Sequence, residues 1–126
     1  MSTKSIDVVD MECNLRTNFE SLSSIYAGLV ELTKKKDAEY GASWCRRGGQ
    51  GAYFTMIRKF DRLETQMKAR GYNILDPRGD DPSSTESLDE TIKDAINYLG
   101  LILERRMAIR AELEEAAAAT KAYVNQ

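Results

Sequence analysis

The stretch that decides the fold is SLDETIKDAINYLGLILERRMAIRAELEEAAAATKAYV, residues 87–124. Apolar residues recur in it at alternating spacings of four and three, which is the pattern of one face of an α-helix. We therefore expect a single helix over 87–124. The apolar stripe, interrupted only at Arg106, consists of Leu88, Ile92, Ala95, Leu99, Ile102, Ile109 and Leu113.

Such a helix is long for a chain of this size. At 1.5 Å per residue it would span about 55 Å, whereas a domain of 126 residues has a radius of gyration of only about 14 Å. The helix must therefore kink, break or project, and Gly100 is one point at which it could bend. Because the stripe persists past the expected edge of the domain, we favour projection into another subunit.

Two shorter helices are predicted upstream. Apolar residues spaced three and four apart over 15–32 predict the first, which should end in the lysines at 34–36 because cations suit a helix C-terminus. A similar stripe predicts the second over about 51–69. A loop over about 38–50 should join them, and the segment 72–84 contains the proline and glycine residues of another loop.

No segment alternates as a strand does, so the predicted class is all-α: an oligomeric bundle of three to four helices. The length of 126 residues predicts one domain, 1–126. We expect its core at about 14–104 and an oligomerisation extension at 105–124, which makes a second copy of the chain a predicted partner.

Composition excludes several classes of function. A net charge of -2 disfavours binding to DNA, RNA or an acidic membrane, and the absence of histidine removes His-based triads and most zinc sites. Cys13 and Cys45 lack the number and spacing of a disulfide framework or a metal site, which predicts reduced thiols in the cytoplasm. No stretch has the apolar core of a signal peptide or a membrane span.

One face of the long helix carries polar residues that could bind a metal ion or a ligand. Glu90, Asp94 and Asn97 are spaced four and three apart, so they share the face opposite the apolar stripe. Two carboxylates one turn apart can hold a hard divalent cation, and Asn97 can hydrogen-bond a ligand. Tyr98 beside this face indicates a pocket or a packing partner. The alternative is that Ser87 and Glu90 form a capping box and that Asp94 is solvated.

The second helix offers a candidate phosphate site. Lys59 and Arg62 lie three residues apart and can converge on one phosphate, the arginine by its fork and the lysine as a point charge. Glu64 lies near the edge of the apolar stripe, where it would face a cleft. The alternative is an exposed face of mixed charge with weak ion pairs.

The loop before that helix could bind an anion or a base. Arg46 and Arg47 precede a glycine-rich segment, 48–51, whose bare backbone and following helix N-terminus favour a phosphate. Tyr40 and Trp44 can stack on a nucleotide base, although burial in a core is the commoner role of such residues. The segment lacks the lysine and the Ser/Thr of a Walker loop.

The order of three motifs resembles a known family. They are KKDAEYGASW (35–44), IRKFDRL (57–63) and ESLDETIKDAINY (86–98). Together they resemble the nucleotide modification associated domain 1 family, which is frequent in phage genomes, over about residues 33–103. That family is similar to the all-α nucleotide pyrophosphohydrolases of MazG type.

The resemblance implies functional roles by position. Glu39 and Tyr40 match the acidic-Tyr-Gly element, and the catalytic candidates are Glu90 and Asp94 of the final motif together with Glu64. The family's chemistry implies that helix-borne acids hold Mg²⁺ while water attacks a nucleoside triphosphate. The implied metal ligands are Glu90 and Asp94, completed by Glu39, Asp61 or Glu64, and the nucleotide-binding residues are Lys59, Arg62, Arg46, Arg47, Tyr40, Trp44, Asn97 and Tyr98.

Three functions follow as hypotheses. The first is a Mg²⁺-dependent nucleoside triphosphate pyrophosphohydrolase of phage nucleotide metabolism. The second is a phage protein that sequesters a nucleotide signal of host defence in the host cytoplasm without turnover. Arg58, which stands where an acid is expected, favours the second, whereas Glu90 in place of aspartate is a mild change. The third is a helical assembly protein without a small-molecule site.

Overall fold

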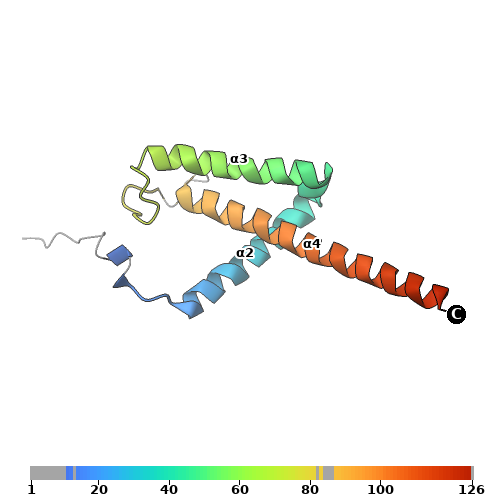
Figure 1. Cartoon of the computed structure of the whole chain (residues 1–126). Helices are drawn as coiled ribbons and strands as arrows, with labels where there is room; N and C mark the ends of the chain where they lie inside the picture. Colours follow the sequence, from blue (N-terminus) through green and yellow to red (C-terminus); the bar gives the residue numbers. More distant parts are fainter. Residues whose placement is uncertain (1–10, 13, 82, 84–86, 126) are drawn as a thin grey trace, which may run out of the picture.

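A computed structural model describes residues 11–12, 14–81, 83 and 87–125. Its long helices are α2 (Phe19–Tyr40), α3 (Gly48–Lys68) and α4 (Leu88–Val124), and the short 3-10 helix η1 (Ser43–Cys45) lies between α2 and α3 (Figure 1). The described residues contain no strand, so the predicted all-α class is confirmed. The helix predicted over 87–124 is also confirmed, with Ser87 as its N-cap.

The helices form one packed pair and one crossing helix. α3 runs antiparallel to the first half of α4 and lies along it, while α2 crosses α4 near its middle (Figure 1). The second half of α4 projects away from the other helices. The cavity described below lies where the C-terminal end of α2 and η1 meet α4.

The described core is small. Thr91 is the most buried side chain, at 1 % exposure, and its hydroxyl donates a hydrogen bond to the Ser87 carbonyl oxygen. Ser87 Oγ accepts from the Glu90 amide at 3.2 Å, which is one half of the predicted capping box. The buried hydrophobic side chains among the described residues are Leu29, Ala52, Met67, Leu88 and Ala95.

The first predicted helix differs from the structure at both ends. It begins at Phe19 rather than Leu15, because Asn18 Oδ1 accepts a hydrogen bond from the Ser21 amide at 3.1 Å and so caps the helix. It continues to Tyr40, past the lysines at 34–36. Gly41 ends it in a left-handed conformation with φ +62°, which a glycine adopts without steric cost.

The glycine-rich segment also differs from prediction, because it opens α3 instead of forming a loop. α3 begins at Gly48, three residues before the predicted start. A Cβ on Gly51 would lie 2.7 Å from Cβ of Arg47. The glycine at this position therefore allows a close approach within the first turn, which accounts for it without a ligand.

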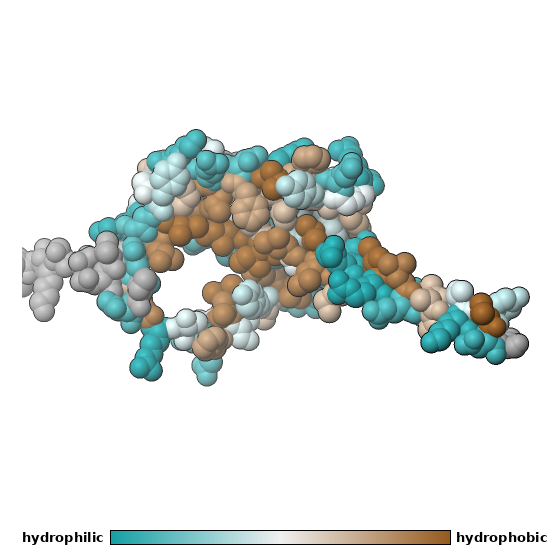
Figure 2. Space-filling view, viewed as in Figure 1, coloured by the Kyte–Doolittle hydropathy of each residue, from teal (hydrophilic) through white to brown (hydrophobic). Residues whose placement is uncertain are grey.

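Much of the apolar stripe of α2 is uncovered. Leu29 is buried, but Phe19 near the start of the helix is 74 % exposed. Figure 2 shows a hollow between the N-terminal half of α2 and the α3–α4 layer, with hydrophobic side chains on both sides of it. Contacts among the described residues therefore cover only part of the predicted apolar stripe.

The long helix does not break. It runs through Gly100 without interruption, and every described residue from 103 to 125 is exposed. Its coverage by another subunit stays a prediction. No helix among the described residues combines the length and the apolar character that crossing a bilayer requires.

Candidate functional site

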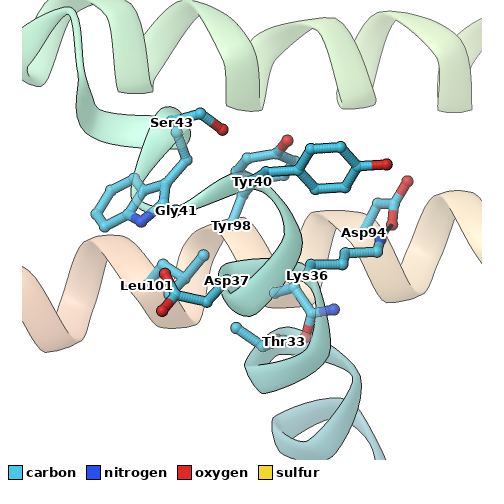
Figure 3. A pocket seen from close by; sticks show the side chains of 11 residues that line it. Thr33, Lys36, Asp37, Tyr40, Gly41, Ser43, Asp94, Tyr98 and Leu101 are labelled. Carbon is cyan, nitrogen blue, oxygen red and sulfur yellow. Dashed lines mark hydrogen bonds and ion pairs between the residues drawn. The ribbon is translucent and has the colours of Figure 1, made fainter.

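A cavity of about 110 Å³ lies between the end of α2, η1 and the middle of α4. Figure 3 shows the side chains of Tyr40 and Tyr98 at the cavity, with Lys36 extending towards Asp94. Ligand sites for whole drug-sized molecules are usually larger, about 300–1,000 Å³, so the cavity would enclose one part of such a ligand. Its lining residues are Thr33, Lys36, Asp37, Tyr40, Gly41, Ser43, Trp44, Asp94, Asn97, Tyr98 and Leu101.

Asp94 is the electrostatic centre of the site. Its Oδ1 lies 3.2 Å from Nζ of Lys36 on α2, and its Oδ2 lies 3.2 Å from Nζ of Lys59 on α3. The Asp94 and Lys59 side chains are 21 % and 22 % exposed, so water screens this pair less than a surface pair. One carboxylate thus joins three helices and pairs with two ammonium groups, and Asp37 is a second carboxylate in the cavity lining.

Two of the aromatic rings that line the cavity each have a cation nearby. Nζ of Lys59 lies 5.8 Å from the centroid of the Tyr98 ring, and Cζ of Arg105 lies 5.4 Å from that of Trp44. Both separations allow a cation–π attraction. Nη1 of Arg105 also lies 3.5 Å from the free thiol of Cys45, which it contacts as a donor. Arg105 therefore holds η1, and with it Trp44, against α4.

The amide of Asn97 is an unsatisfied donor beside the cavity. Its Nδ2 is buried and has no hydrogen-bond partner among the described residues. A buried polar group without a partner costs about 1–3 kcal/mol. Asn97 also lines the cavity, so its amide is a polar group of this site that lacks a partner among the described residues.

Several of the predicted site residues come together here. Tyr40, Trp44, Asp94, Asn97 and Tyr98 line the cavity, although 58 residues separate the ends of this set in sequence. Lys59 joins them through its ion pair with Asp94. The sequence did not predict Thr33, Lys36 or Asp37 as site residues, because cations suit a helix C-terminus, whereas α2 continues past the lysines to Tyr40.

The other predicted site residues lie elsewhere. Glu90 pairs with Lys93 on its own helix at 3.4 Å. The side chains of Glu39, Asp61 and Glu64 are exposed. Exposed Arg46 and Arg47 and half-buried Arg62 likewise do not line the cavity.

The arrangement of acids fits a metal poorly. Mg²⁺ demands near-octahedral oxygen coordination, usually from one or two carboxylates with water and phosphate. Both carboxylate oxygens of Asp94 already pair with lysines. No three Asp, Glu or Cys side chains in the described ranges are close enough to hold an ion. We derive no step through a metal, and Mg²⁺ binding stays a prediction.

No family model, no curated protein and no solved structure significantly matches this chain. The resemblance to the nucleotide modification associated domain 1 family therefore stays a prediction. The function proposed below therefore rests on the geometry of the cavity.

Proposed function

We propose that the cavity binds a nucleotide without turning it over. The observation that carries this proposal is the pairing of Lys36 and Lys59 on one carboxylate beside a group of aromatic rings. A nucleotide needs a flat apolar surface for its base and cations for its phosphate, and this site offers both.

The nucleotide base would bind against the aromatic side chains. Tyr40 is 65 % exposed, although it borders the cavity, and an exposed ring gains by stacking. Base stacking on an aromatic ring contributes about 1–3 kcal/mol. The buried Nδ2 of Asn97 would donate to a carbonyl oxygen or a ring nitrogen of the base.

The phosphate would bind to the ammonium groups of Lys36 and Lys59. A phosphate oxygen would replace Asp94 in front of Lys36 and Lys59, and Asp94 would then turn towards solvent. This exchange needs no metal, because the two ammonium groups supply the positive charge. Binding without hydrolysis suits sequestration, such as that of a nucleotide signal by a phage protein in its host.

Isothermal titration calorimetry tests this function. Mono-, di-, tri- and cyclic nucleotides would be titrated into the protein with EDTA, and again with Mg²⁺, while pyrophosphate release is followed. We expect metal-independent binding and no turnover. Mg²⁺-dependent release of pyrophosphate would support the pyrophosphohydrolase instead. Absence of binding to every nucleotide would leave the assembly role.

We also propose self-association through the projecting part of α4, residues 105–124. Met107, Ile109 and Leu113 are each more than half exposed, at 59 %, 51 % and 66 %. Most of the stability of a helix in a protein comes from packing of its apolar face, so burial against a second copy would stabilise this segment. Sedimentation velocity over a range of concentrations tests this: a species of constant monomer mass would contradict it.

A further inference from the structure

Asp37 differs from the other charged side chains that line the cavity. Those are Lys36 and Asp94, which pair with each other, and Asp94 also pairs with Lys59. The Asp37 carboxylate, in contrast, makes no hydrogen bond or ion pair with any of the described residues. An ionised carboxylate is an acceptor only. Both oxygens of Asp37 can therefore accept hydrogen bonds from N–H groups of a ligand in the cavity.

Asp37 also lies apart from the cations of the site. In Figure 3, Lys36 extends towards Asp94 on the right, whereas the Asp37 side chain lies on the left. Because a carboxylate repels a phosphate and the ammonium groups of Lys36 and Lys59 attract one, the charges orient a bound nucleotide with its base towards Asp37. Asp37 and Tyr40 are three residues apart on α2, so the acid neighbours the ring on which the base would stack.

The bases differ in what they offer to a carboxylate. Guanine carries its N1–H and its N2 amino group side by side, so the two carboxylate oxygens can accept from both at once. Such a bidentate, charge-assisted pair is stronger than a single neutral hydrogen bond. Adenine and cytosine each present one amino group beside a ring nitrogen that is itself an acceptor. In uracil and thymine, the N–H of this edge lies between two carbonyl oxygens. Guanine is therefore the base that matches a carboxylate on this edge.

We infer that Asp37 selects a guanine nucleotide, by accepting hydrogen bonds from N1–H and from the N2 amino group of the base. This inference rests on the nucleotide binding proposed above and adds the identity of the base. The buried Nδ2 of Asn97 does not contribute to the selection, because every base carries an acceptor for it.

Calorimetry with three nucleoside triphosphates in EDTA tests the selection. GTP should bind about tenfold more tightly than ATP, because ATP leaves the charged acceptor without its pair of donors. Inosine triphosphate keeps N1–H but lacks the amino group, so its affinity should lie between the two. Equal affinities for GTP and ATP, or tighter binding of ATP, would overturn the inference and leave the proposed nucleotide binding intact. Absence of binding by all three would overturn both.

An exchange of preference tests the role of Asp37. The base of xanthosine triphosphate has a carbonyl oxygen in place of the amino group of guanine, and an Asn side chain can donate to it. Asp37→Asn should therefore lower the ratio of GTP affinity to xanthosine triphosphate affinity about tenfold or more. A ratio cancels the general effect of the lost charge on phosphate binding.

Glu31→Gln is the matched control. It removes an equal charge from α2, from an exposed acid that pairs with Lys34 and does not line the cavity, so the ratio should stay at the wild-type value. If Asp37→Asn also keeps the wild-type ratio, Asp37 does not contact the base and the inference fails.

Discussion

The two halves of α4 share one helix and one apolar stripe, yet their surroundings differ completely. In the first half, Leu88 and Ala95 are 5 % and 7 % exposed against α3 and α2. In the second half, Leu113 is 66 % exposed and contacts solvent. The comparison shows that periodicity identifies the face that must be covered but not the element that covers it. The site, too, belongs to the covered half.

The largest expected difference between the halves is in stability. Leu88→Ala should lower the free energy of unfolding by about 2–5 kcal/mol, because it opens a void in the packed core. Leu113→Ala should change it by less than about 0.5 kcal/mol at concentrations that keep the chain monomeric. Urea denaturation followed by circular dichroism measures both. Equal losses would mean that the two halves are equally packed.

A second prediction concerns the cations of the covered half. The double variant Lys36→Ala/Lys59→Ala should weaken nucleotide binding about 10- to 100-fold, because charge-assisted bonds to phosphate are lost. Lys34→Ala/Lys35→Ala removes the same charge from α2 without touching the cavity and serves as the control. Calorimetry should show near-unchanged affinity for the control. Equal weakening of both would show a general charge effect instead.

A smaller effect is expected at Asp94, with opposite signs for the two candidate functions. Asp94→Asn removes the carboxylate that competes with phosphate, so metal-free nucleotide affinity should rise about three- to tenfold. Glu90→Gln, one turn away, should leave it unchanged because Glu90 pairs with Lys93 outside the cavity. If Asp94→Asn instead loses nucleotide binding, and no metal-free condition restores it, the result would indicate that Asp94 holds a cation.

The smallest effect lies in the loop before α4. Hydrogen bonds from the Arg78 side chain and amide lower the pKa of Asp76 from 3.8 to about 2. Because the folded pKa is the lower one, this interaction stabilises the loop above pH 4 and is lost as the pH falls towards 2. Arg78→Ala should return the pKa towards 3.8, as measured by carboxyl ¹³C chemical shifts. Arg46→Ala should not move it, and an unchanged titration in Arg78→Ala would contradict the assignment.

Local chemistry made much of the fold predictable. Ser87 and the alternating stripe fix the start and the length of α4, because a cap and a periodic face depend on neighbours in sequence. The predicted end of α2 was wrong, because the lysines at 34–36 are a weaker signal of a helix end than Gly41, whose positive φ ends the helix. The expected oxidation state of Cys13 concerns a residue outside the described ranges.

The site was predictable only in part. The sequence predicted the site residues Tyr40, Asn97 and Tyr98. No sequence pattern, however, paired Asp94 with Lys36, which is 58 positions away, or with Lys59. Such pairs depend on how α2 crosses α4, and sequence periodicity does not encode a crossing. Extending the spacing from Leu29 through Thr33 to Lys36 and Tyr40 would have placed Thr33 and Lys36 on the face of α2 that borders the cavity.

The unbroken course of α4 through Gly100 has a mechanical consequence. Tyr98 at the cavity and Val124 near the tip belong to one rod, with about 39 Å between them at 1.5 Å per residue. Over that length, a tilt of about 5° at the cavity displaces the tip by about 3 Å. A rigid helix of this length thus converts a small rotation beside the cavity into a larger displacement at its C-terminal end, so the proposed ligand binding and the proposed self-association would influence each other.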